Sequence, residues 1–451
     1  MVYEGKMVFS QFMEIVSWKS FQTCVDRYRG DWKVKSFYCR EFFRVMVFAQ
    51  ITGRSSISEI VLCLNAVSHH LYHVGIRSPL TKSNLAHANN TRSWKILYDY
   101  AQVLIREATS LYRNEPLELD IDRCVYALDS TSISLCLSLF PWARFRKKKS
   151  SIKMHTLINL QGKIPDFILI SKGRMSDVKA MDHITWEAGC WYVMDRAYLD
   201  FERLYMIHQS QSWFVTRSKK NAKYRRVYSR KVDKSKGLIC DQMVRLTGTG
   251  VAKKYPELIR RIKYIDPETG KRLVFLTNNM SVSAETIAEL YKNRWHVELF
   301  FKWIKQRLHI KSFYGRSDNA VWSQLWISVC VYLMIAILKK HWNLPQTLSE
   351  ILHILSVTPF EKCLFLRCFS EKIHKFKLVL ILNSCYYSTY NWTLVIPSCI
   401  IVNQVYPYFW KFTPIFWTKS LQNLYDFCMV FQQITSRSQS AIPPNLEPEP
   451  G

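Results

Sequence analysis

Acidic residues are scarce in this chain. Its 451 residues include 35 Asp and Glu against 63 Lys and Arg, which gives a formal net charge of +28 at pH 7. Hydrophobic residues make up 48% of the sequence and aromatic residues 14%, so the chain can bury a core and is not a disordered basic tail. An excess of this size indicates a polyanionic partner, of which nucleic acid is the commonest. A membrane surface is the competing interpretation, whereas a small acidic metabolite does not require so much charge.

The sequence also lacks the features of a secreted or membrane-spanning protein. No two of its 13 cysteines have Cys-x-x-Cys spacing and their number is odd, so buried free thiols in a reducing cytoplasm fit better than a disulfide framework. Glu4 and polar breaks at the N-terminus are unlike a secretory signal. The longest apolar stretch, residues 325–338, is shorter than the roughly 20 residues that a bilayer requires, so we expect a buried helix there.

The length of the chain and the changes in its residue pattern predict several domains. Residues 1–115 are mostly helical in pattern, and Ser56 followed by Glu59 has the capping-box spacing that begins a helix. Short basic helices joined by tight turns are compatible with a helical DNA-binding domain of the helix-turn-helix type. An ordinary helical subdomain fits the same pattern, and this segment alone does not separate the two.

After residue 115 the residue pattern changes to one that predicts alternating strands and helices, which is an α/β pattern. We expect a core in two parts, residues 116–217 and 283–345, separated by a basic, β-rich insertion at 218–282. The strands of the first part are predicted at residues 123–128, 152–159, 167–171, 191–194 and 213–216. Residues 346–451 are interpreted as a C-terminal tail of doubtful integrity, because most of this segment is aromatic, rich in cysteine and poor in acids, without clear periodicity.

Two of the predicted strands run directly into an aspartate, Asp129 and Asp195. An acid at the carboxyl end of a buried strand is held at the sheet edge where α/β folds place their sites, although a single one commonly caps a turn. A third acid, Glu298, lies on a strong helix predicted at residues 284–308. The three acids are therefore candidates for one shared site.

The spacing of polar residues on that helix supports such a site. At about 100° per residue, Arg294, Glu298 and Lys305 lie within about 60° of Tyr291 around the helix. An apolar stripe beside them is suited to packing the helix on the sheet. A solvated face of ion pairs is the alternative interpretation.

A ligand set of three carboxylates, with no sulfur or imidazole ligand, suits Mg²⁺ or Mn²⁺ better than zinc. In a basic protein they best explain two-metal phosphodiester chemistry, in which two ions per site, about 3.5–4 Å apart, stabilise the attacking and leaving oxygens. Arg294 and Lys305 would hold phosphates beside Glu298.

At this point the chain resembles a known family. Tyr291, Arg294, Glu298 and Lys305 have the spacing of the Y-R-E-K signature of the DDE transposases of the fourth insertion-sequence family, which are bacterial enzymes with a ribonuclease-H-like core. Residues 128–131 and 193–198 resemble the two aspartate motifs of that family, and residues 140–157 resemble its basic second-strand region. The resemblance covers roughly residues 8–360.

The resemblance implies an α/β fold with a ribonuclease-H-like mixed sheet, in which Asp129, Asp195 and Glu298 are catalytic and bind two Mg²⁺ ions. It implies cleavage of the ends of a mobile element, followed by joining of the freed 3′-hydroxyls to target DNA. Tyr291, Arg294 and Lys305 would bind the terminal phosphates. Further DNA contacts are expected from basic residues near the first aspartate, which are Arg144, Arg146, Lys147 and Lys153.

The expected partners are double-stranded DNA, as inverted-repeat ends and as target, and a second copy of the chain on paired ends. We expect no membrane partner, and a bacterial, cytoplasmic, nucleoid-associated location. Two alternatives stay open: a related nuclease without strand transfer, and a catalytically silent or decayed transposase-derived DNA-binding protein. The likeness fades after about residue 362, which we interpret as a frameshifted or decayed C-terminus.

Overall fold

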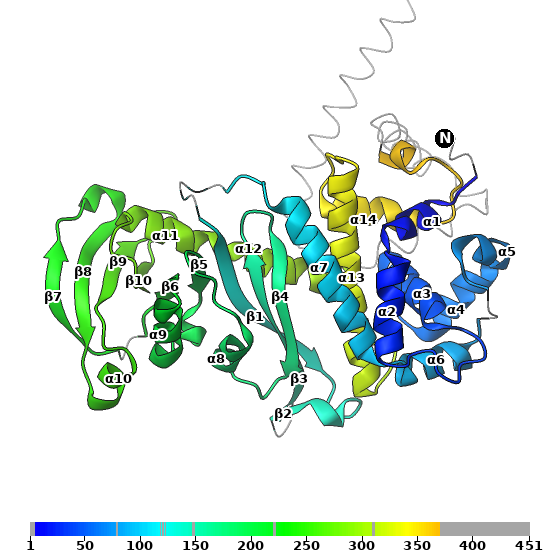
Figure 1. Ribbon diagram of the computed structural model, residues 1–451, viewed down its shortest axis with the longest axis horizontal. Helices are drawn as coiled ribbons and strands as arrows, with labels where there is room; N and C mark the ends of the chain where they lie inside the picture. Colours follow the sequence, from blue (N-terminus) through cyan, green and yellow to red (C-terminus); the bar gives the residue numbers. More distant parts are fainter. Residues whose placement is uncertain are drawn as a thin grey trace, which may run out of the picture. The chain divides into compact units, whose positions relative to one another are not determined.

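The computed structural model describes residues 5–369, apart from 78, 79, 118, 120, 122, 147, 148, 220, 221 and 309–311. The described residues belong to one compact unit. Within this unit an N-terminal group of helices is followed by a mixed β-sheet and then by the helices that close the fold (Figure 1).

The N-terminal region consists of short helices, as its pattern predicts. Ser56 caps one of them, since its hydroxyl accepts a hydrogen bond from the Glu59 backbone N–H at 3.2 Å. The elements are α1 (Val8–Phe12), η1 (Met13–Ile15), α2 (Trp18–Arg27), α3 (Cys39–Ile51), α4 (Ile57–Ala66), α5 (Ser68–Leu71), η2 (Tyr72–Val74), α6 (Lys82–Thr91) and α7 (Trp94–Tyr112).

The central sheet contains each of the five strands that the sequence predicts for its first part. These are β1 (Val125–Leu135), β3 (Lys149–Asn159), β4 (Ile164–Lys172), β5 (Trp191–Met194) and β6 (Trp213–Arg217). Their order is β4-β3-β1-β5-β6, in which β3 alone runs antiparallel to the other four strands. The predicted ribonuclease-H-like mixed sheet is thereby confirmed. The short η3 (Pro141–Ala143) and β2 (Arg144–Arg146) precede β3.

The strands of the predicted insertion extend this same sheet. They are β7 (Tyr224–Arg230), β8 (Leu238–Leu246), β9 (Ile259–Ile265) and β10 (Arg272–Thr277), with η6 (Lys234–Lys236) and α10 (Thr249–Lys254) between them. β10 pairs antiparallel with β6, so hydrogen bonding continues from the core strands into the insertion. The domain boundaries stay predictions.

Alternation along the central strands divides the sheet into two faces. Tyr126 and Leu128 of β1 belong to a buried cluster on one face, with α9 (Phe201–Gln209), η4 (Met181–His183) and η5 (Arg196–Tyr198). Val125 and Ala127 belong to the larger cluster on the other face, with α11 (Ala284–Asn293) and α12 (Trp295–Arg307). The short α8 (Asp177–Ala180) lies with α9 on the first face (Figure 1).

The closing helices include the long apolar helix that the sequence places at residues 325–338. α13 (Asp318–His341) is long and apolar enough to cross a membrane, but its whole apolar window is buried inside the fold, where α13 packs along α7. The expectation of a buried helix is confirmed. α14 (Leu348–Val357) and η7 (Phe365–Phe369) follow it.

The start of the predicted tail packs against the N-terminal helices. The backbone N–H groups of Val8 and Phe9 donate to the carbonyls of Glu361 and Pro359 at 3.0 and 2.9 Å. The buried Gln11 side chain donates to the Cys363 carbonyl at 2.7 Å. Residues 370–451 lie outside the described residues, so the expectation of a decayed C-terminus stays a prediction.

A buried ion pair in the insertion provides a stability prediction. The Arg260 guanidinium donates to both carboxylate oxygens of Asp241 at 2.9 and 2.7 Å, and the two side chains are only 2% and 6% exposed. Asp241→Ala leaves a buried guanidinium without its counter-charge, and we expect the free energy of unfolding to fall by about 3–5 kcal/mol in urea denaturation. Glu268→Ala, which removes the exposed partner of Lys292, is the control and is expected to leave the unfolding midpoint unchanged. An equal loss in both variants would contradict the prediction.

Candidate active site

The pairing of β1 with β5 places the first two acids side by side. The parallel register ends with Leu128 opposite Met194, so Asp129 and Asp195 are the next residues on neighbouring strands. Both lie on the face of the sheet that carries α11 and α12, because Ala127 and Val193 belong to the cluster on that face. One detail of the prediction is wrong, since β1 does not end at Asp129. It continues to Leu135 because β3 still pairs with it there.

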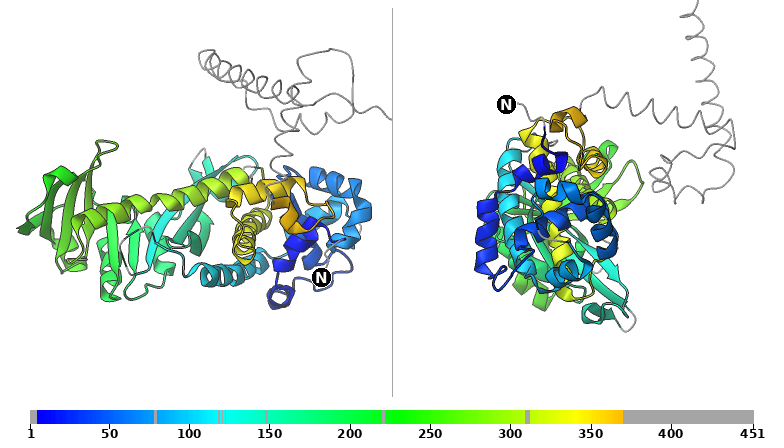
Figure 2. Two further views of the ribbon diagram at one scale, coloured as in Figure 1. Left: turned by 90° about the horizontal axis from the view of Figure 1, so that it is seen from above. Right: turned by 90° about the vertical axis from the view of Figure 1, so that its right-hand side faces the viewer.

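The catalytic helix is present, but it is two helices that meet at Arg294. α11 ends at Asn293 and α12 begins at Trp295, while Arg294 keeps an α-helical conformation between them. The two run one after the other along the sheet (Figure 2, left). The prediction of one helix over residues 284–308 is therefore wrong at this joint. The joint consists of two tighter turns, in which Arg294 N–H donates to the Tyr291 carbonyl and Val297 N–H to the Arg294 carbonyl.

The joint brings the predicted residues of the helix to the aspartates. The Arg294 guanidinium donates to Asp129 and also to Glu298, the latter at 2.7 Å. The Tyr291 hydroxyl donates to Asp195 Oδ1 at 3.1 Å. The Arg294 guanidinium thus bridges Asp129 and Glu298, while the Tyr291 hydroxyl holds Asp195.

Lys305 lies further along α12 and contacts the continuation of β1. Its ammonium donates to the Ser132 carbonyl at 2.9 Å. The predicted apolar stripe of the helix, which packs it on the sheet, is buried throughout and consists of Leu290, Val297, Phe301, Ile304 and Leu308. Tyr291, Arg294 and Glu298 therefore lie at the site, and Lys305 lies beside the continuation of β1. The catalytic roles of all four signature residues stay predictions.

Burial and neighbouring charges shift the pKa values of Asp129, Tyr291 and Arg294. Burial raises the pKa of Asp129 to about 6, although Arg294 and the Ser130 backbone N–H lower it. Burial also raises the pKa of Tyr291 to about 12, which keeps its hydroxyl a proton donor to Asp195. Burial works against the charge of Arg294, but Asp129, Tyr291 and Glu298 raise the pKa of its guanidinium above the ordinary value. Arg294 therefore stays charged.

The donor set of the site fits a hard divalent cation, because all three acids offer only carboxylate oxygens. Across the described ranges, the one trio whose ligand atoms all lie within 4.8 Å of one another is Glu361, Cys363 and Cys368. The three acids of the site are spread more widely, and the Arg294 guanidinium bonds to two of them. Cation binding would thus require some exchange of the Arg294 contacts.

A hollow of about 640 Å³ lies beside the joint. Arg217, Tyr291, Arg294 and Trp295 line its wall on the core side, and Trp295 is 57% exposed. The insertion contributes Lys236 and Lys271 to the lining. The hollow is mixed in charge, because acids line it together with these cations: Asp266, Glu268, Glu285 and Glu289. A phosphodiester chain held there would contact the cations.

The structure describes three of the four basic residues that are predicted to bind DNA near Asp129. Lys153 forms an ion pair with Asp177 at 3.1 Å and is 16% exposed, so its charge is already partnered inside the fold. Arg144 and Arg146 lie on β2, which pairs with the start of β3. Lys147 lies outside the described residues. Their predicted DNA contacts stay predictions.

Sequence reasoning missed Asp177, whose Oδ1 also accepts a hydrogen bond from the Ser130 hydroxyl at 2.6 Å. In the sequence, Asp177 is an ordinary acid at the start of a predicted helix. Only the tertiary structure places it beside Ser130, on the face of β1 opposite to Asp129. His155 is fully buried near it, with Nδ1 at 3.7 Å from Asp177 Oδ1 and Nε2 at 3.2 Å from the Ser171 hydroxyl.

Comparison with known proteins decides what this core is. Residues 120–334 match the sequence model of the "Transposase DDE domain", and residues 4–77 match a "Domain of unknown function". The central region is a transposase DDE domain. A domain of this kind implies dependence on a divalent metal. The more specific assignment to the fourth insertion-sequence family stays a prediction.

Individual relatives agree with the DDE domain. "Putative transposase y4zB" of Sinorhizobium fredii is 34% identical over 47% of this chain and 59% of its own length. "Probable transposase for insertion sequence element IS5377" of Geobacillus stearothermophilus is 28% identical over 53% of this chain and 61% of its own. The chain thus spans about three fifths of these two relatives. A piggyBac transposase synaptic complex with hairpin DNA aligns over 78% of both chains with a TM-score of 0.38 and 11% identity, too low to support an inference.

The buried His155 of the DDE domain predicts a pH dependence of stability. Burial lowers the pKa of His155 from 6.5 to about 4, against the opposing effect of Asp177. Between pH 6.5 and 4 the unfolded chain therefore binds a proton that the folded chain does not, and stability falls as the pH falls. His155→Gln is expected to remove up to about 3 kcal/mol of this loss, measured by urea denaturation from pH 7.5 to 4. An unchanged slope would show that His155 does not contribute.

Proposed function

We propose that this protein is an insertion-sequence transposase, which cuts the ends of its element by metal-dependent phosphodiester hydrolysis and joins the 3′-hydroxyls to target DNA. The observation that carries the proposal is the convergence of Asp129, Asp195 and Glu298 through the shared contacts of Arg294 and Tyr291. The match of residues 120–334 to the transposase DDE domain supports it.

The three carboxylates are proposed to hold two Mg²⁺ ions, or Mn²⁺. Bound there, such ions supply an activated attacking oxygen and stabilise the leaving oxygen. The protein side chains around the ions orient the carboxylates. Tyr291 directs the Asp195 carboxylate, and Arg294 offsets the repulsion between Asp129 and Glu298 until DNA phosphate takes over its guanidinium.

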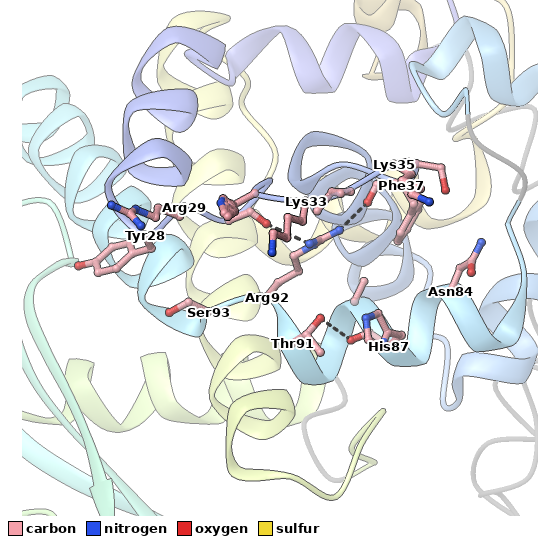
Figure 3. A pocket seen from close by; sticks show the side chains of 15 residues that line it. Tyr28, Arg29, Lys33, Lys35, Phe37, Asn84, His87, Thr91, Arg92 and Ser93 are labelled. Atoms are coloured by element: carbon pink, nitrogen blue, oxygen red, sulfur yellow. Dashed lines mark hydrogen bonds between the residues drawn. The ribbon is translucent and has the colours of Figure 1, made fainter.

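The N-terminal helices are proposed to bind DNA away from the acids. A hollow of about 440 Å³ lies between the loop after α2 and the helix α6 (Figure 3). The loop presents Arg29, Lys33 and Lys35 at its exposed rim, with Trp32 49% exposed beside them. None of these three cations has a carboxylate within 4.0 Å among the residues that the structure describes. Free cations beside an exposed aromatic ring suit a phosphate backbone.

The loop that carries these cations is held in a defined shape. The Arg92 guanidinium donates to the carbonyls of Gly30 and Phe37 at 3.0 and 3.1 Å, which ties both ends of the loop to the end of α6 (Figure 3). A Cβ on Gly30 would lie 2.5 Å from the Ile96 side chain, so the backbone is seated closely on α7. A preformed loop loses little conformational entropy when it binds DNA.

The partners in this proposal are the inverted-repeat ends of the element, the target DNA and a second copy of the chain on paired ends. A nucleoid-associated place in the bacterial cytoplasm follows from DNA as the substrate. A nuclease that lacks strand transfer would produce cut ends without joined products.

Two helix carboxylates, one in the site and one outside it, provide the test of function. Glu298→Gln removes one proposed metal ligand, and we expect cleavage of DNA that carries the flanking inverted repeats to fall by roughly 1,000-fold or more with Mg²⁺ or Mn²⁺. Glu202→Gln changes an exposed acid on α9 in the same way and should cleave like the wild type. Cleavage by Glu298→Gln at the wild-type rate, or no cleavage by the wild type, would overturn the proposal, and joined products would identify strand transfer.

The basic loop predicts a change in the salt dependence of DNA binding. If Lys33 and Lys35 each contact one phosphate, Lys33→Ala/Lys35→Ala should reduce the slope of log K against log salt by about 1.8. Lys19→Ala/Lys253→Ala removes two exposed lysines elsewhere and serves as the matched control. Fluorescence anisotropy with a labelled duplex, between about 50 and 300 mM salt, measures the salt slopes of both variants. Equal slopes for the two variants would remove the loop from the DNA-binding surface.

A further inference from the structure

Asp129 and its neighbour Ser130 point to opposite faces of β1. Asp129 lies on the face of α12, where Arg294 bonds to it. Ser130 lies on the other face with Leu128, whose cluster contains η4 and η5. The Ser130 backbone N–H nevertheless donates to Asp129 Oδ1 at 2.7 Å. The position of Ser130 therefore influences the orientation of the acid.

A polar cluster on the far face holds the Ser130 side chain. Asp177 Oδ1 accepts from the Ser130 hydroxyl at 2.6 Å and from the Lys153 ammonium at 3.1 Å. His155 is directly opposite Ser130 in the β1–β3 register, and its Nδ1 lies 3.7 Å from the same oxygen. The Asp177 side chain is 23% exposed, so this cluster lies largely inside the fold.

We propose that Asp177 is a positioning residue for the catalytic acid Asp129. From behind the sheet it fixes Ser130, whose backbone N–H in turn holds the Asp129 carboxylate in the orientation that a metal ion requires. This inference rests on the proposed function, because it assumes that Asp129 is a metal ligand. Asp177 is not a ligand itself, since its carboxylate is engaged by Ser130 and Lys153 on the opposite face.

The neighbouring groups explain why a charged carboxylate is stable there. Lys153 supplies the positive charge, and the lowered pKa of His155 leaves the imidazole neutral at pH 7, so the cluster needs no second cation. Tyr198 is fully buried close to Asp177, and burial raises the pKa of its hydroxyl, which stays neutral too. The Lys153 ammonium thus balances the charge of the Asp177 carboxylate that holds Ser130.

The test measures metal binding directly in the purified full-length protein, without DNA. Mn²⁺ affinity is measured by isothermal titration calorimetry for the wild type, Asp177→Ala, Ser130→Ala and Ser130→Thr. We expect a loss of roughly 10- to 100-fold in Asp177→Ala and Ser130→Ala, the range typical of groups that orient a metal ligand. Ser130→Thr keeps the hydroxyl and should retain most of the wild-type affinity.

A double variant separates positioning from general damage. Because Asp177 and Ser130 act through one hydrogen bond, Asp177→Ala/Ser130→Ala should lose no more affinity than either single variant. Asp182→Ala removes a nearby acid that binds Arg203 and is expected to bind Mn²⁺ like the wild type. If Asp177→Ala fails to fold, the comparison of Ser130→Ala with Ser130→Thr decides the question alone.

The possible results distinguish this inference from the proposed function. Wild-type affinity in Ser130→Ala would overturn the positioning role while leaving cleavage intact. Complete loss of Mn²⁺ binding in Asp177→Ala, equal to that of Asp129→Ala, would make Asp177 a ligand and also overturn it. A wild type that binds Mn²⁺ but cuts no DNA, with affinity reduced in Ser130→Ala, would refute the transposase proposal and support the positioning role.

Discussion

Repulsion between carboxylates is the constraint on which the site depends. Two strands and one helix bring three acids to one edge of a sheet, where burial already raises the pKa of Asp129 to about 6. The Arg294 guanidinium binds two of these acids, and Tyr291 binds the third through its neutral hydroxyl. Without this cation, three like charges would lie in a half-buried space with no partner. The joint between α11 and α12 is the place that makes both contacts geometrically possible.

The alternation of a β-strand allows one site to be built from two sides. Asp129 faces α12, while Ser130 faces the cluster of Asp177, Lys153 and His155. Contacts on the second face can therefore orient the acid without competing for its ligand positions. The insertion adds a further level of support, because its strands continue the core sheet and the buried Arg260 anchors the segment that leads to α11.

The positive charge of the chain is distributed in a way that matches this division. Some cations, such as Arg294, Lys153 and Arg260, are committed to carboxylates inside the fold. Others, such as Arg29, Lys33 and Lys35 of the loop after α2, have no carboxylate within 4.0 Å among the described residues. The first group stabilises the structure, and the second is available to a polyanion.

Much of the core could be predicted from the sequence. Apolar runs that end in acids predicted β1 and β5, and helical spacing predicted that Tyr291, Arg294 and Glu298 share an edge, because these patterns are local and carry their own periodicity. The break at Arg294, the continuation of β1 beyond Asp129 and the place of Asp177 were decided only by the tertiary structure. Each depends on a partner distant in sequence: the acids around Arg294, the strand β3, and Ser130, 47 residues away from Asp177. The sequence by itself determined which residues could do the chemistry, and long-range packing decided how they are held, since hydrogen bonds between distant segments leave no local pattern.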